Sequence, residues 1–266
     1  MASETAESAE AEGARSGAQA VERAVALLRC FDGNAATISL TELAQRTGLR
    51  VSTAHRIVRA LVRGDLLDQD PMTERYRLGR AFAILGQAAM AGFGFHVAHP
   101  ELVRLAEATG EAASLGLRDG ADVVVALTAP SSQPLRFDQP AGTRLDLHAS
   151  AMGKVLLAFS DPDVKATVAT LGALARYTDA TITRRTTLQR ELRTIREQGY
   201  APNLEERYVG VSGLAAPVLD AAGQARAAVG VRGPAARLDA SRMEVLAPQV
   251  MATAQLVATL LPLDRL

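Results

Sequence analysis

The segment 50–63 concentrates residues that could contact nucleic acid. It contains four arginines and no acidic residue, and hydroxyl side chains stand near its start. If the segment is helical, its apolar residues fall on one face and its polar residues on the other. Guanidinium and hydroxyl groups on an exposed helix suit the phosphates and base edges of a DNA major groove. The residues that we expect to contact DNA from this helix are Arg50, Ser52, Thr53, His55, Arg56 and Arg59.

Two short helices joined by a turn would position these side chains. Ser39 followed by Glu42 is the pattern of a capping box, which predicts a helix start. Gly48 stands where a left-handed cap would end that helix, and a second helix is expected from Val51 to Arg63. Helix, glycine turn and basic helix in this order indicate a helix-turn-helix. A helical hairpin with a solvated basic face would give a similar pattern, so this motif alone is a weak signal.

A hairpin after the basic helix would make the motif winged. Short apolar runs at 66–67 and 76–78 flank a turn that contains Pro71, which predicts two short strands. Arg75 and Arg77 then belong to the wing, where we expect them to touch the DNA backbone. The capping box, the glycine turn, the acid-free helix and the hairpin together are far more specific than any one of them.

Composition and charge limit the classes of function. The chain has 266 residues, of which 48% are hydrophobic and 22% charged, and its formal net charge is zero. These values are typical of a globular protein with room for two domains. The single cysteine, Cys30, excludes a disulfide framework and a multi-cysteine zinc site. With no apolar run of roughly 20 residues and no secretory pattern at the start, we expect a cytoplasmic protein that contacts no membrane.

The chain divides into four parts by pattern. Residues 1–17 carry no apolar periodicity and are expected to form a disordered tail. A winged helix-turn-helix domain is expected over 18–79, and a linker helix over 80–98. The linker helix would either pack against a partner subunit or be buried within its own domain. The rest, 99–266, is expected to be one domain.

Strand and helix patterns alternate over 99–266. Two hairpins are predicted, one turning at Asp119–Gly120 and the other near Ala222–Gly223. Other elements are expected as a short strand near 135–137 and helices at 148–159, 162–171, 188–198 and 241–261. An antiparallel sheet with helices on its faces follows, and the fold class is therefore α+β.

Candidate catalytic groups do not form a set. His148 and Ser150 are too close in sequence for the usual base and nucleophile, and no GxSxG elbow is present. His148 is better explained as a structural residue at a helix start. His96 and His99 could share a metal, but no further ligand is evident. We expect no cofactor, no metal and no enzyme activity; a ligand-independent DNA-binding module and, less favoured, an enzyme stay open as alternatives.

Several stretches in order resemble the IclR family of bacterial transcriptional regulators. They are AVERAVALL, GLRVSTAHRIVRALVRGDLL and YRLG, then RLDLHASAMGKVLLAF, ELRTIREQGYAPNLEERYVGVSGLAAPV and AAVGVRGP. The resemblance implies a winged helix-turn-helix, a linker helix and a GAF-like effector-binding domain. It also implies a homodimer or tetramer on a palindromic operator of double-stranded DNA. A small-molecule effector would control the protein, more often as a repressor than as an activator.

The same resemblance implies which residues line the effector pocket. By position they are Phe137, Leu145, Ala151, Met152, Asn203, Val211, Gly213, Gly230 and Arg232. Family members that bind small oxo-acids tend to have an acid near position 203 and small hydroxyl residues near 230 and 232, so this chain departs from that pattern. We expect Arg232 to pair with a carboxylate effector, with Gly213 and Gly230 leaving room. Alternatively, Arg232 turns outward or pairs with Glu205 or Glu206.

Overall fold

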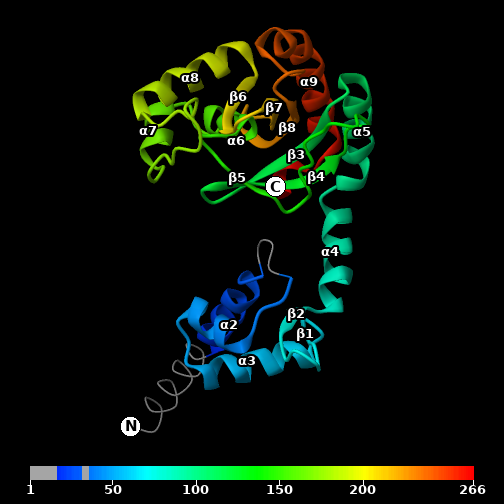
Figure 1. Ribbon diagram of the computed structural model, residues 1–266, viewed down its shortest axis with the longest axis vertical. Coiled ribbons are helices and arrows are strands. Elements are labelled where there is room, and N and C mark those ends of the chain that lie inside the picture. The colour runs from blue at the N-terminus through cyan, green and yellow to red at the C-terminus, as the bar shows by residue number, and fades with distance from the viewer. Residues whose placement is uncertain (1–16, 32–35) are drawn as a thin grey trace. The chain divides into compact units, whose positions relative to one another are not determined.

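The computed structural model describes residues 17–31 and 36–266, and they form two compact units (Figure 1). The chain passes from one unit to the other between Ala89 and Met90, inside the stretch expected to be the linker. The predicted tail lies outside the described residues except for its last residue, Gly17, which is helical.

The first unit has the elements of a winged helix-turn-helix. After a helical segment over the described residues 17–29 come α2 (Leu40–Thr47), α3 (Val51–Arg63), β1 (Leu67–Gln69) and β2 (Tyr76–Leu78). The two strands pair antiparallel, which confirms the predicted hairpin. The core is formed by buried side chains from every element, among them Leu27, Ile38, Leu43, Val58 and Leu67.

Local signals fix the start and the end of α2. The Glu42 N–H donates to Ser39 Oγ at 3.2 Å, and the Ser39 N–H donates to the Glu42 carboxylate at 2.8 Å. This is the predicted capping box, and it satisfies two N–H groups that a helix start otherwise leaves unpaired. Gly48 ends the helix with a φ of 66°, a conformation that favours glycine. A short turn over residues 48–50 then leads into α3.

The stretch expected as one linker helix contains two helices. The first, α4 (Arg80–Gly92), has no buried residue, and its Ile84 and Leu85 are exposed. Burial of the linker within its own domain is therefore wrong. The second helix, α5 (Phe95–Thr109), belongs to the second unit. Among the described residues no single helix is long and apolar enough to cross a membrane; only α4 and α5 together, a bent pair, meet that length and composition.

The second unit is a six-stranded antiparallel sheet between two layers of helices. The order is β5-β4-β3-β8-β7-β6, so β3 and β8 join the two predicted hairpins at the centre. The strands are β3 (Ala112–Asp119), β4 (Asp122–Ala129), β5 (Arg144–Asp146), β6 (Ala201–Tyr208), β7 (Val211–Leu219) and β8 (Ala225–Pro234). This is the α+β architecture expected from the sequence.

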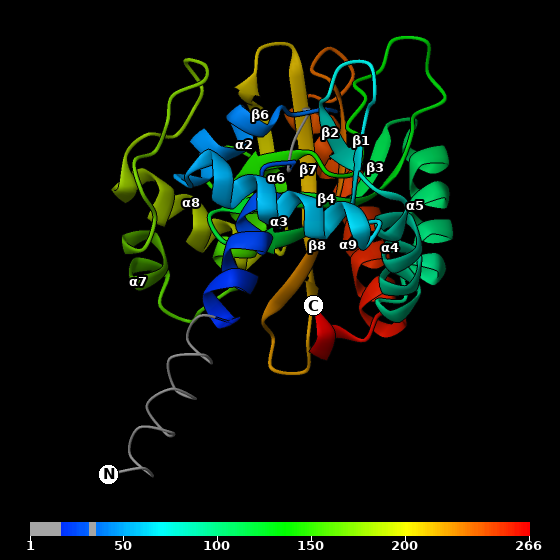
Figure 2. The same cartoon turned by 90° about the horizontal axis from the view of Figure 1, so that it is seen from below.

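Helices cover both faces of this sheet (Figures 1 and 2). One face carries α6 (Ala151–Ala158), α7 (Val164–Ala169) and α8 (Arg185–Gln198), and the other carries α5 and α9 (Ala240–Leu260). A short 3₁₀ turn, η1 (Leu263–Arg265), follows α9. Each face of the sheet has its own hydrophobic core, and successive strand residues contribute to the two cores in turn. Leu214 packs towards α5 and α9, whereas Ala215 packs towards α6, α7 and α8. Both faces are therefore apolar, as in a buried central sheet.

The strand expected near 135–137 is wrong. The structure has a loop over 130–143, and the edge of the sheet is β5 instead. Pro134 and Pro140 flank the apolar run, and proline cannot donate to a strand ladder. The loop lies beside β8 through a hydrogen bond described below.

A methyl group added at Gly153 is expected to destabilise the second unit. Gly153 lies in the fully buried helix α6, and its added Cβ would be 2.4 Å from the carbonyl oxygen of Leu147. Because the obstacle is backbone, relief requires α6 to shift, and overpacking of this kind costs about 1–3 kcal/mol. The urea midpoint of Gly153→Ala should fall. Gly172→Ala is the matched control, since nothing lies within 4 Å of its added Cβ; equal midpoints for the two variants would contradict the expectation.

Candidate DNA-binding helix and effector pocket

The residues expected to contact DNA lie on the exposed face of α3 and at its N-cap. The opposite face buries Ala54, Val58 and Leu61. Exposed side chains on the outer face are Arg50, Ser52, His55, Arg56 and Arg59, with Thr53 half-buried beside them. The helix begins without a side-chain cap and without an acid in its first turn. Its first N–H groups and the positive end of its dipole thus remain available to an anion.

The side chains of three arginines of α3 and its N-cap make no hydrogen bond or ion pair with the described residues. In the described part of the chain, no hydrogen bond or ion pair holds the guanidinium of Arg50, Arg56 or Arg59. The wing arginines differ. Arg75 bonds the Glu42 carboxylate at 2.9 Å and also the hydroxyl and carbonyl of Thr37, and Arg77 bonds Asp68 at 2.6 Å. Contact of these two arginines with DNA stays a prediction. In the structure Arg75 links the wing to Thr37 and to α2, and Arg77 links β2 to β1.

A cavity in the second unit collects most of the residues expected to line an effector site. It lies between β6, β7, β8 and the start of α6; its cavity volume is about 30 Å³, or about 340 Å³ of empty space when the open solvent at its mouth is included. Seven expected residues line it: Leu145, Ala151, Met152, Asn203, Gly213, Gly230 and Arg232. Phe137 and Val211 are not among the lining residues, although the Phe137 ring packs on Arg232. Gln139, Ala149, Ser150, Arg207, Leu214 and Val231 also line the cavity and were not expected.

Arg232 reaches into this cavity without an acidic partner. Its Nη1 donates to Gln139 Oε1 at 3.0 Å, and its Cζ lies 4.4 Å from the Phe137 ring centroid. Among the described residues no carboxylate lies within ion-pair distance, so neither Glu205 nor Glu206 is its partner and it does not turn outward. Desolvation lowers the pKa of Arg232 to about 10. A guanidinium in such a place is still charged at neutral pH and lacks a counterion.

Gln139 provides a hydrogen-bond donor at the cavity that has no acceptor among the described residues. Its side chain is 4% exposed, and its Nε2 has no hydrogen-bond partner in the described structure. A buried polar group left unpaired costs about 1–3 kcal/mol. Gln139 comes from the 130–143 loop, from which only Phe137 was expected as a pocket residue.

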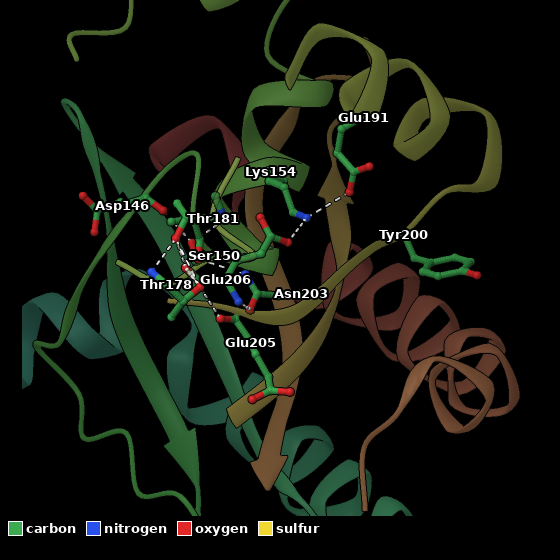
Figure 3. Close-up of polar contacts among 12 residues, drawn as sticks. Asp146, Ser150, Lys154, Thr178, Thr181, Glu191, Tyr200, Asn203, Glu205 and Glu206 are labelled. Carbon is green, nitrogen blue, oxygen red and sulfur yellow. Dashed lines mark hydrogen bonds and ion pairs between the residues drawn. The ribbon is translucent and has the colours of Figure 1, made fainter. Parts of the chain in front are cut away.

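A bulge in β6 brings Arg207 to the cavity. Register is lost between Leu204 and Tyr208, and Glu205 has a φ of 58°, the left-handed region. The extra residues break the period-2 alternation, which is why the sequence did not predict this strand. Thr178 and Thr181 donate to the bulge carbonyls of residues 205 and 206 at 2.8 and 2.6 Å and hold it in place (Figure 3).

Lys154 and Glu206 form a buried ion pair behind the bulge. Lys154 is fully buried, and its Nζ donates to Glu206 at 2.5 Å and to Glu191 at 2.9 Å (Figure 3). The second Glu206 oxygen has no hydrogen-bond partner in the described structure. Burial raises the pKa of Glu206, and Lys154 opposes part of that rise. Glu205 points away from this cluster, towards the turn at Gly210.

Backbone and side-chain atoms of the protein already occupy the room expected at two glycines. A Cβ on Gly230 would lie 2.9 Å from the Leu214 carbonyl oxygen and 3.4 Å from Met152 Cε. A Cβ on Gly213 would meet Val231 O at 3.2 Å and the Arg232 side chain at 3.8 Å. These glycines therefore accommodate the neighbouring strand and the side chains of Met152 and Arg232. The expectation that they simply leave space for an effector is corrected accordingly.

The remaining histidines have structural or surface positions. His148 is buried, and its Nε2 lies 2.9 Å from the Ala175 carbonyl oxygen. The cap of α6 is Ser150, whose Oγ accepts from the Gly153 N–H at 3.1 Å, so the helix begins later than expected. His96 and His99 are exposed on α5. In the described structure they are not part of any group of three or more potential metal ligands.

Comparison with known domains decides the family. A model of the bacterial transcriptional regulator IclR C-terminal domain matches residues 95–259, and one of the IclR helix-turn-helix domain matches residues 20–71. The chain belongs to the IclR family. This assignment confirms the resemblance seen in the sequence: the regulator carries a DNA-binding domain and an effector-binding domain.

Relatives of this IclR-family protein are named as regulators and not as enzymes. The regulator is 36% identical over 241 residues to the HTH-type transcriptional regulator BhcR of Paracoccus denitrificans, covering 90% of this chain and 86% of the relative. It is 30% identical over 252 residues to the transcriptional repressor AllR of Escherichia coli, covering 94% and 93%. An IclR homolog of Microbacterium hydrocarbonoxydans, solved with 4-hydroxybenzoate, shares the fold at a TM-score of 0.77 and 23% identity, over 90% and 99% of the two chains.

Proposed function

We propose that this protein is a cytoplasmic, effector-controlled repressor that binds a palindromic operator as a homodimer or tetramer. The outer face of α3 supplies the DNA contacts; the absence of partners for Arg50, Arg56 and Arg59 among the described residues supports this assignment. A carboxylate effector binds in the second unit and changes the arrangement of the DNA-binding domains. The effector can do so only by binding one arrangement more tightly than another.

One observation carries the choice of a carboxylate. Arg232 lies in the cavity, and its hydrogen-bond partner there is the neutral amide oxygen of Gln139. A carboxylate in that place would neutralise the guanidinium and could accept two parallel hydrogen bonds from it. The unpaired Gln139 Nε2 adds a donor at the same place. The 4-hydroxybenzoate in the Microbacterium homolog is also a carboxylate, which supports this class of ligand.

Arg232→Gln is expected to weaken carboxylate binding by at least roughly tenfold, because a hydrogen bond between charged groups is lost. Affinities would be measured by calorimetric titration with a panel of aliphatic and aromatic acids, and each binding acid would then be tested for release of bound DNA. Arg226→Gln is the matched control: it lies on the same strand, β8, but bonds Asp220 at 2.7 Å away from the cavity. If acids bind wild type and Arg232→Gln equally well, the proposed role of Arg232 is wrong.

A further inference from the structure

The cavity holds a second guanidinium that the family resemblance does not explain. Arg207 lines it together with Arg232, and no carboxylate is among its lining residues. Arg207 lies over the Tyr177 ring, with its Cζ 3.7 Å from the ring centroid. The bulge in β6 is what turns this side chain to the pocket.

Arg207 is only partly matched by its neighbours. Its Nε lies 3.1 Å from Asp146 Oδ2, yet this nitrogen is buried and has no hydrogen bond of acceptable geometry within the described structure. The other Asp146 oxygen accepts a hydrogen bond of 2.6 Å from the Tyr177 hydroxyl. Asp146 therefore offsets the charge of Arg207, while among the described residues no hydrogen bond engages the two Nη groups of Arg207.

Both guanidiniums lie close to the ring of Tyr208. The Cζ of Arg232 lies 5.1 Å from the Tyr208 ring centroid and the Cζ of Arg207 lies 5.3 Å from it, so the two carbons are at most about 10 Å apart. The positive charge of Arg207 also acts on Arg232 and lowers its pKa. Apolar side chains of Leu145, Ala151, Met152 and Leu214 line the same cavity. Two cationic groups and apolar walls in one cavity suit a ligand that carries two anionic groups on a short hydrocarbon chain.

We propose that the effector is a short aliphatic dicarboxylate, with one carboxylate bound by Arg232 and the other by Arg207. This inference rests on the proposed function, since it names the class of acid that binds in the same pocket. Arg207 is then the residue that distinguishes diacids from monoacids. Gln139 yields its place on Arg232 to the first carboxylate, and its unpaired Nε2 becomes a donor to that carboxylate.

The test compares a diacid with a matched monoanion. Glutarate and monomethyl glutarate, and likewise succinate and its monomethyl ester, differ by one charge at nearly the same length. Calorimetric titration of the full-length protein at neutral pH should show each diacid binding at least tenfold more tightly than its ester. In Arg207→Gln the two affinities should come within about threefold, because the diacid loses more affinity than the ester does. Arg207→Lys should restore part of the preference, which separates loss of charge from loss of folding, and Arg226→Gln should keep all of it.

The outcomes separate this inference from the proposed function. Equal or tighter binding of the esters in wild type, or an undiminished diacid preference in Arg207→Gln, overturns the dicarboxylate but leaves a carboxylate effector in place. If other monocarboxylates bind and neither diacid does, the dicarboxylate is likewise overturned and a carboxylate effector remains. If no member of either acid panel binds, both proposals fall.

Discussion

Arg56→Ala is expected to weaken specific DNA binding by roughly 5- to 150-fold, equivalent to about 1–3 kcal/mol. Arg56 lies in the middle of the exposed face of α3 and has no intramolecular partner in the described structure. Its loss therefore removes contacts to DNA without breaking a bond inside the domain. If Arg56 reads a base edge, the loss should be confined to specific DNA. A phosphate contact would instead weaken all DNA alike and lower the slope of affinity against salt by about one.

The measurement is a gel-shift titration at two salt concentrations. The DNA is a fragment that wild type retains from pooled genomic DNA in the presence of nonspecific competitor. Arg63→Ala is the matched control, because it removes the same charge from the last turn of the same helix, outside the expected contact residues. We expect its affinity to stay within about threefold of wild type, since a single distant charge contributes little at physiological salt. Equal losses for the two variants would mean that α3 acts through its total charge and that its outer face does not read the operator.

The wing arginines should behave differently from Arg56. Arg75 bonds Glu42, which also closes the capping box of α2. The pKa of Glu42 is lowered, chiefly by its hydrogen bond from the Ser39 backbone and in part by the charge of Arg75. A change at Arg75 therefore disturbs the start of α2 as well as any contact with DNA. For this reason the test of the interface is placed on α3.

Lys154→Met is expected to destabilise the second unit by about 3–5 kcal/mol at slightly alkaline pH, because it leaves the buried Glu206 carboxylate without its partner. The loss should shrink as the pH falls. Burial already raises the pKa of Glu206 above 4.5, and removal of Lys154 raises that pKa further. An acid whose folded-state pKa is raised stabilises the fold fully below its unfolded-state pKa, and this contribution is lost as the pH rises through the folded-state pKa. Because the unfolded-state pKa is common to both proteins, the deficit of the variant grows as the pH rises from the folded-state pKa of Glu206 in wild type to its higher folded-state pKa in the variant.

Urea unfolding of wild type and Lys154→Met at about pH 5.5 and about pH 8 measures this dependence. The double variant Lys154→Met with Glu206→Gln is the control, because it removes the titrating carboxylate and keeps its shape. Its stability deficit relative to wild type should be smaller than that of the single variant at the higher pH, and it should vary less between the two conditions. A single-variant deficit that is the same at both pH values would show that Glu206 does not carry the effect.

The position of this ion pair links it to the pocket. Glu206 and Arg207 are adjacent in the β6 bulge, with one directed to Lys154 and the other to the cavity. Asn203 supports the same segment: its Nδ2 donates to the Ala149 carbonyl at 2.8 Å, and its Oδ1 accepts from the Glu206 N–H at 3.3 Å. Lys154 thus helps to hold the backbone from which Arg207 projects.

The sequence alone determined the local structure of the first unit and the fold class of the whole. The capping box at Ser39, the left-handed turn at Gly48 and the amphipathic pattern of α3 depend on neighbours within a few residues, and each was found where it was predicted. The hairpins β3–β4 and β7–β8 have the same local origin in alternating apolar residues and turn signals. Seven pocket residues could be placed only with the help of the family resemblance, because they are far apart in the chain.

Only the tertiary structure decided the chemistry of the pocket. Arg232 donates to Gln139 because the 130–143 loop lies beside β8, and these two residues are 93 positions apart in the chain. Arg207 enters the cavity because a bulge shifts the register of β6, and a shift of one residue reverses the face to which a strand side chain points. The burial of Lys154 depends on packing between α6, α8 and β6. Such features arise from long-range packing, which hydrophobic periodicity does not encode, and they are the ones that set the charge presented to an effector.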